Sequence, residues 1–212
     1  MSSTVEILVE FRREDYQRII SRLELLANRS VIRKAIYLAA DRAADHGVTE
    51  IKRGIAREYT IPKGRIGAAV KKYRYGSAVN GMSIGIRLRD TARPLSDFKY
   101  SPTKPSRKPV FAEIKRGSNK PIPAAFVTTV GSDNHVGPML RVPGQMMKEP
   151  YKYSVGRGPY SGKGRQAIRT ASGPSVTGMF KANEPLYQGV WNIIFDSFGE
   201  RFEHEVERLL NA

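Results

Sequence analysis

Serines and glycines gather in the stretch "ASGPSVTGMF", residues 171–180, whose small residues are typical of a catalytic loop. A serine nucleophile needs a neighbouring base to take its proton. The stretch contains no histidine or acidic residue that could activate Ser172 or Ser175. We therefore predict a structural role, in which Gly173 supplies a backbone angle that other residues avoid. Ser175 then caps a short helix, and the helix plugs three apolar residues into the core: Val176, Met179 and Phe180.

Other patterns that could support catalysis or ligand binding also fail in detail. The stretch "GRGPYSGKGR", residues 156–165, has glycine spacing one residue short of a phosphate-binding loop, and Gly164 stands where a Mg²⁺-binding hydroxyl is needed. The chain has no cysteine, and its acidic residues in the central region are scattered singly. No metal-ligand spacing relates the three histidines, His46, His135 and His204. We predict that the protein is not an enzyme and has no catalytic residue, cofactor or metal site.

Charge is the strongest signal in the composition. The formal net charge is +16 over 212 residues, and residues 51–183 hold 26 basic and six acidic residues. Residues 1–50 are neutral overall, whereas residues 184–212 hold two basic and six acidic residues. A dense positive surface attracts polyanions, above all nucleic acid, although it can also face an acidic protein.

The apolar pattern predicts an α+β fold. Strand-like alternation covers residues 5–11, and helical spacing follows over 14–27 and from Ser30 to Gly47, with Thr49 capping a continuation. Several strands come next, and one of them is indicated by apolar residues that alternate with small or charged ones: Met82, Ile84, Ile86 and Leu88. A last helix capped by Asn183 runs to about residue 210. We expect an antiparallel sheet packed against an N-terminal helical region and a long C-terminal helix. We also expect a single domain over residues 1–212, with extended basic loops at about 99–109 and 143–165.

Two sets of residues stand out as candidate contact sites. A short helix within "TIPKGRIGAAVKKYRYG", with Pro62 in its first turn, carries basic residues. Five basic residues on it or just after it are candidates to face DNA: Lys63, Arg65, Lys71, Lys72 and Arg74. The same helix can equally be an ordinary exposed one. The last helix has an unusually wide aromatic side, for which we expect core packing and subunit contact: Trp191, Phe195, Phe198 and Phe202.

The chain resembles the minor tail protein Z family of long-tailed bacteriophages. The resemblance covers roughly residues 30–210 and depends on the order of short patterns, not on any single motif. These patterns are "IRKAIYLAADRAADHGVTEIKRGIAREY", "KGRIGAAVKKY", "ARPLSDF", "IPAAFVTTV", "GPMLRV" and "RTASGPSVTGMF".

The resemblance implies a structural virion protein that completes the tail. Related tail-completion proteins form rings, commonly six-fold, at the head-proximal end of the tail tube. The implied partners are copies of the same chain in a hexameric ring, tail terminator, tail tube or head–tail connector proteins, and the phage DNA in the channel. The basic middle region would suit a ring around DNA. The resemblance also implies head-to-tail contacts between copies, which can close into a ring.

Two further expectations follow from the sequence. The start of the chain lacks a secretory signal, and no apolar stretch approaches the roughly 20 residues that cross a membrane, so we expect no membrane partner and assembly in the host cytoplasm. The alternative function is a free, sequence-nonspecific nucleic-acid-binding protein, although the chain has no helix-turn-helix, zinc-finger or RNP-like motif.

Overall fold

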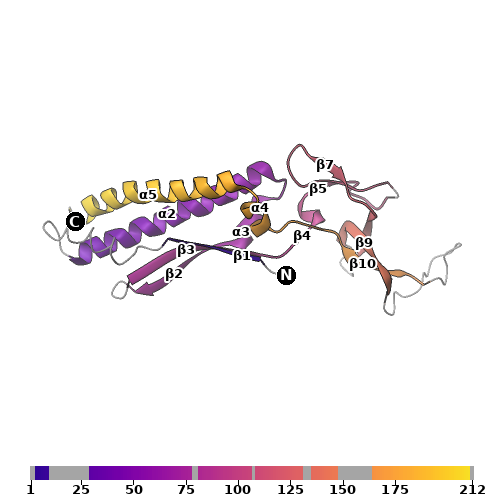
Figure 1. The fold of residues 1–212 in the computed structure, drawn as a ribbon, viewed down its shortest axis with the longest axis horizontal. Helices are drawn as coiled ribbons and strands as arrows, with labels where there is room; N and C mark the ends of the chain where they lie inside the picture. The colour runs from indigo at the N-terminus through magenta and orange to yellow at the C-terminus, as the bar shows by residue number, and fades with distance from the viewer. Residues whose placement is uncertain are drawn as a thin grey trace. The chain divides into compact units, whose positions relative to one another are not determined.

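The computed structural model describes residues 3–9, 29–77, 81–106, 108–130, 135–147 and 164–210. Within these ranges, α-helices combine with antiparallel β-sheets, and a long helix lies in each terminal part of the chain (Figure 1). The prediction of an α+β fold is confirmed. Contacts group the chain into unit 1, residues 1–57, 63–91 and 175–212, and unit 2, residues 58–62 and 92–174. A compact unit need not fold independently, so the single domain stays a prediction.

Unit 1 is built around two long helices, α2 (Arg29–Glu58) and α5 (Glu184–Leu210), which lie side by side (Figure 1). An added Cβ at Gly54 would come within 2.2 Å of Leu186, and one at Gly47 within 2.7 Å of Ile194. Later residues of α2 thus meet earlier residues of α5, so the helices run antiparallel. The two glycines let the helices approach closely. Helix α2 also buries several small residues: Ala35, Ala39, Ala40, Ala43 and Ala44.

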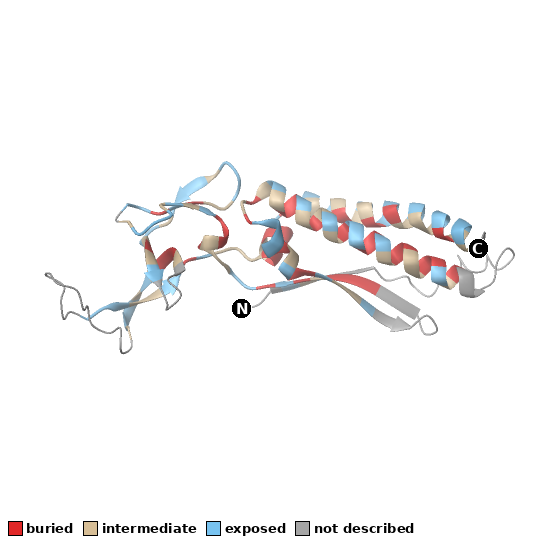
Figure 2. Cartoon of the chain, turned by 180° about the vertical axis from the view of Figure 1, so that it is seen from behind, coloured by how far each residue is buried: buried red, intermediate tan, exposed pale blue. Residues whose placement is uncertain are grey.

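Unit 1 also contains a three-stranded antiparallel sheet with the order β1 (Ser3–Val9), β3 (Gly81–Asp90) and β2 (Val70–Ser77). Ile84, Ile86 and Leu88 alternate along β3 and are buried. An added Cβ at Gly47 would also come within 2.9 Å of Ile86, so this face of the sheet packs against α2. Figure 2 shows buried residues recurring along both long helices, with exposed residues on their outer sides.

The prediction that Gly47 ends a helix and that Thr49 starts a new one is wrong. Helix α2 continues through both residues, and the Thr49 hydroxyl donates to the Asp45 backbone carbonyl over 2.9 Å. Gly47 is tolerated inside the helix because Ile194 and Ile86 occupy the space that a side chain would take. Ser30 lies inside the first turn of α2, and the predicted helix over residues 14–27 lies outside the described residues.

Two predicted helix caps are confirmed in unit 1. The Ser175 hydroxyl accepts a 3.0 Å hydrogen bond from the Gly178 amide at the start of α4 (Val176–Lys181). The Asn183 side chain accepts a 3.0 Å hydrogen bond from the Leu186 amide in the first turn of α5. The apolar residues of α4 are buried as expected: Val176, Met179 and Phe180.

In its described residues, unit 2 contains strands of two to 12 residues and one 3-10 turn, η1 (Leu95–Asp97). One sheet has the order β5-β6-β7, a second β10-β9-β8, and β11 pairs with β4. Gly173 lies in β11, where an added Cβ would come within 2.8 Å of the Phe98 ring. The glycine therefore makes room for Phe98, and the prediction that it supplies an unusual backbone angle is wrong. The strand bounds are β4 Arg93–Pro94, β5 Lys99–Ser101, β6 Phe111–Glu113, β7 Asn119–Pro121, β8 Ala125–Val130, β9 His135–Met146, β10 Gln166–Thr170 and β11 Ser172–Gly173.

The two loops predicted at about 99–109 and 143–165 begin later than expected, because the first residues of each range belong to strands. Residues 99–101 form strand β5 and pair with β6, although the proline-rich stretch after them is irregular. Strand β9 continues through residues 143–146, where the sequence indicated a loop. A change of register against β10 admits Pro143 and Gly144 there, and Gly144 takes a φ of 73° that favours glycine. Residues 148–163 lie outside the described residues.

Candidate functional site

The five basic residues predicted to face DNA lie on two different elements. Lys63 and Arg65 are exposed on α3 (Lys63–Ala69). Lys71, Lys72 and Arg74 lie on strand β2, because the chain pairs with β3 immediately after α3 ends. Successive side chains of a strand point to opposite faces, so Lys71 is separated from Lys72 and Arg74. These three residues directly follow the short helix, as predicted, but they lie on a strand and do not all point the same way. That any of the five residues faces DNA stays a prediction.

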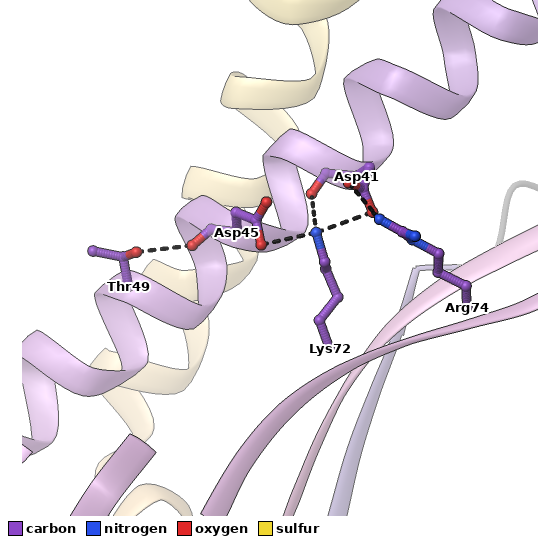
Figure 3. Close-up of polar contacts among 5 residues, drawn as sticks. All are labelled: Asp41, Asp45, Thr49, Lys72 and Arg74. Carbon is purple, nitrogen blue, oxygen red and sulfur yellow. Dashed lines mark hydrogen bonds and ion pairs between the residues drawn. The ribbon is translucent and has the colours of Figure 1, made fainter. Parts of the chain in front are cut away.

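Lys72 and Arg74 point toward α2 and are held by its carboxylates (Figure 3). The Lys72 Nζ atom lies 3.0 Å from Asp41 Oδ1 and 2.8 Å from Asp45 Oδ1. The Arg74 guanidinium donates through Nε and Nη2 to the two oxygens of Asp41, each over 2.9 Å. These contacts fasten strand β2 to helix α2.

The charges of this cluster stabilise one another. Burial by itself raises the pKa of Asp41, but the hydrogen bonds from Lys72 and Arg74 outweigh burial and lower the pKa below its ordinary value. Burial likewise lowers the pKa of Lys72, but hydrogen bonds to Asp45 and Asp41 raise the pKa above its ordinary value. Both shifts favour the charged forms of Asp41 and Lys72. The cluster is therefore an internal clamp, and its two cations are engaged within unit 1.

The opposite face of the same sheet carries a second set of cations. We call it the open face, and it comprises Thr4, Glu6, Lys71, Tyr73, Gly85, Arg87 and Arg89. Lys71 lies beside Arg87 on neighbouring strands, and Glu6 lies on the other side of Arg87. The Arg87 Nε atom donates to Glu6 over 2.7 Å. Lys71 and Arg89 are exposed, so their charges face solvent.

The open face has a shallow hollow beside an aromatic ring. Thr4, Glu6, Arg87 and Arg89 line a hollow of ≈ 450 Å³. The Tyr73 ring fills the space over Gly85, where an added Cβ would come within 2.4 Å of it. The Arg87 guanidinium lies 4.8 Å from the centre of that ring, which is cation–π geometry. The arrangement can attract phosphate groups through its cations, whereas the Tyr73 ring is already engaged within the sheet.

Arg87 and Arg89 were missed by the sequence reasoning, although their signal was present. The alternation of Ile84, Ile86 and Leu88 predicted a strand, and apolar residues that alternate in a strand usually face the core. The residues between them must then point outward, which places Arg87 and Arg89 on the opposite face. The sequence analysis selected the basic residues after Pro62 instead, because positive charges are densest there. A run of adjacent cations in a strand is divided between two faces, whereas alternating cations share one face.

The four aromatic residues of α5 separate into a core pair and a surface pair. Phe198 and Phe202 stack with ring centres 5.9 Å apart and pack against the buried Ile32 and Ile36 of α2. Trp191 is half-buried, and Phe195 is 64% exposed. The rings of Trp191 and Phe195 lie 6.3 Å apart. Phe198 and Phe202 therefore belong to the core, and Trp191 and Phe195 are candidates for contact with another molecule.

One serine–histidine pair forms only in the folded chain. The Ser197 hydroxyl lies 3.1 Å from His46 Nδ1, across the interface between α5 and α2. Serine activated by histidine is a common nucleophile. Ser197 is 7% exposed, so most of the residue is covered by its surroundings. The contact joins two helices.

The described residues contain neither a metal-binding cluster nor a membrane-spanning helix. No group of three or more potential ligands among the described residues is arranged to hold a metal ion. No helix in the described ranges combines the length and apolar character needed to span a bilayer. Comparison with known proteins gives no match to a family model, a curated protein or a solved structure.

Proposed function

We propose that the protein is a structural component of a bacteriophage tail, which completes the tail as a ring at its head-proximal end and turns its open face toward DNA. The resemblance of the sequence to minor tail proteins motivates the tail assignment. The observation that carries the DNA contact is the open face itself. Lys71, Arg87 and Arg89 share one surface of the sheet, while its other surface is packed under α2.

The chemistry of the open face favours phosphate groups over bases. Positive side chains bind the nucleic-acid backbone through charge, without regard to sequence. Stacking of bases would need a free aromatic face, but the Tyr73 ring lies over Gly85 and beside Arg87. Contacts restricted to phosphate suit a channel along which DNA slides. Copies arranged in a ring would add many weak contacts together.

The open face also supports a second function, a free and sequence-nonspecific nucleic-acid-binding protein. Both functions require that the open face binds DNA, and they differ in whether the chain assembles into rings. In a third possibility, the cations of the open face bind an acidic rim on a neighbouring tail protein instead of DNA. Measurements of DNA affinity and of assembly on the same variants separate these possibilities.

The DNA contact is tested with the full chain and the double variant Lys71→Gln/Arg89→Gln. Affinity for short duplexes of two unrelated sequences is measured by fluorescence anisotropy over a series of salt concentrations. Each phosphate contact contributes roughly 0.9 to the slope of log affinity against log salt. The variant should therefore lose about two units of slope, equally for both sequences. The control Lys34→Gln/Lys181→Gln removes the same charge from exposed positions on α2 and α4 and should keep most of the slope.

Assembly is measured on the same samples by negative-stain microscopy and native mass spectrometry, alone and with isolated tail tubes. Rings that bind at one end of the tubes would support the tail function. DNA binding by a chain that stays monomeric would favour the free nucleic-acid-binding protein. Rings whose DNA affinity does not change in the open-face variant, but which no longer join the tubes, would assign the cations to a protein partner.

A further inference from the structure

We infer that the outer face of α5 binds a second copy of this chain, with Trp191 and Phe195 at the centre of the contact and carboxylates around them. The inference rests on the ring proposed above and identifies the surface that builds it. Val190 and Ile194, the neighbours of this pair on α5, are buried against the rest of unit 1. The helix is thereby fixed, and it holds the Trp191–Phe195 pair at the surface.

Phe195 is unusually exposed for a residue of its size, and Trp191 beside it is half-buried. Phe195 is 64% exposed, and its ring lies 6.3 Å from that of Trp191. Aromatic residues are enriched at the centres of protein interfaces and contribute most to binding there. In most protein interfaces, a rim of polar groups surrounds the apolar centre. The pair therefore has the composition of an interface centre.

The charges next to the pair indicate what binds it. Asp196, Glu200 and Glu203 are exposed on α5. Residues 184–212 hold two basic and six acidic residues, whereas residues 51–183 hold 26 basic and six acidic residues. Every copy of the chain thus carries, outside α5, an excess of positive charge that can attract these carboxylates. Charge complementarity of this kind steers association and fixes its orientation.

The same charges decide the symmetry of the contact. Two α5 helices facing each other across a two-fold axis would bring their carboxylates together, which is unfavourable. An α5 helix facing a basic surface of the next copy joins two different surfaces, which is a heterologous contact. Heterologous contacts repeat until they close into a ring or extend into a filament.

The aromatic centre is tested with Phe195→Ser, and the matched control is Phe111→Ser, which changes a 38% exposed phenylalanine in unit 2. Assembly is followed by sedimentation and by the fluorescence of Trp191, the single tryptophan of the chain. In the unaltered protein, the emission should shift to the blue and become protected from iodide as the concentration rises. Phe195→Ser should raise the concentration needed for assembly at least about tenfold, with circular dichroism unchanged. Phe111→Ser should leave that concentration unchanged.

The heterologous geometry is tested with Asp196→Asn/Glu203→Gln. Loss of attraction to a basic surface should weaken assembly, whereas a two-fold α5–α5 contact would be strengthened by removing like charges. Rings that form equally well in Phe195→Ser would overturn the α5 contact and leave the proposed tail function standing. A chain that is monomeric at every concentration would overturn both the α5 contact and the proposed tail function. A monomer whose Trp191 is already protected from iodide would show that its own chain covers Trp191 and Phe195, which would also overturn the α5 contact.

Discussion

The Asp90 carboxylate accepts a 2.9 Å hydrogen bond from the backbone amide of Val176, 86 residues later in the chain. Asp90 ends strand β3, and Val176 begins helix α4. The first amides of a helix lack partners within the helix and favour negative charge nearby. Asp90 and the Ser175 hydroxyl supply acceptors for two of them. The start of α4 is therefore fixed both by its own cap and by the sheet of unit 1.

We predict that both acceptors contribute to the stability of the fold. Ser175→Ala should lower the free energy of unfolding by on the order of 1 kcal/mol through loss of the cap. Asp90→Ala should lower it by about 2 kcal/mol, because the buried Val176 amide loses a charged acceptor. Urea unfolding measures both changes. The exposed Ser172→Ala is the control, and an effect of Ser172→Ala equal to that of Ser175→Ala would contradict the assignment. A hydrolytic activity lost in either serine variant would refute the prediction that the protein is not an enzyme.

Adjacent lysines on β2 should differ sharply when each is replaced by methionine. Lys72 holds Asp41 and Asp45 of α2, and its side chain is 19% exposed. Lys72→Met should lower the free energy of unfolding by about 1 kcal/mol, since Arg74 still compensates part of the Asp41 charge. Lys71→Met should stay within about 0.5 kcal/mol of the unaltered protein, because Lys71 faces solvent. Thermal or urea unfolding of both variants checks the difference, and equal losses would place both lysines in one environment.

The pH dependence of stability should report the same clamp. The pKa of Asp41 is lowered from its ordinary value of 3.8, so its contribution is fully present above that value and is lost as the pH falls through the folded-state pKa. The pKa of Lys72 is raised from 10.5, so its contribution is fully present below that value and is lost as the pH rises through the folded-state pKa. Lys72→Met should flatten both limbs of a curve of unfolding free energy against pH. A curve identical to that of the unaltered protein would show that the clamp contributes nothing.

Glycine-to-alanine changes in the two long helices should have opposite signs. Gly47→Ala places a Cβ within 2.7 Å of Ile194 and 2.9 Å of Ile86, both buried. The clash should cost more than the gain in helix propensity, giving a net loss of about 1 kcal/mol. An added Cβ at Gly189 in α5 meets no atom within 4 Å, so Gly189→Ala should be neutral or stabilise by up to about 1 kcal/mol. Melting temperatures that rise in both variants would show that the helices have room to move apart at Gly47.

The two pairs of aromatic residues on α5 should separate stability from assembly. Phe202→Ala removes packing against Ile32 and Ile36 and should cost about 2 kcal/mol of unfolding free energy. Phe195→Ala removes a mostly exposed ring and should change the unfolding free energy of the monomer by less than about 0.5 kcal/mol. Unfolding is measured at concentrations below assembly. A large loss in Phe195→Ala under those conditions would assign its ring to the core.

Local patterns in the sequence determined the features that depend on neighbouring residues. The alternation of Ile84, Ile86 and Leu88 indicated strand β3, and the spacing of apolar residues after Asn183 indicated α5. The caps at Ser175 and Asn183 were also predictable, because a capping side chain binds an amide only three residues away. The α+β class followed from the order of these elements.

Tertiary structure decided what distant residues do to one another. From the local sequence, Gly47 indicates the end of a helix. In the fold, α2 continues through Gly47, and the side chains of Ile194 and Ile86 fill the space that a side chain at this position would take. Lys71 and Lys72 look equivalent in a basic run, but pairing of β2 with β3 turns Lys71 to solvent and Lys72 to Asp41. Neither outcome can be derived from local spacing, because each depends on a partner that the chain brings into contact only when it folds.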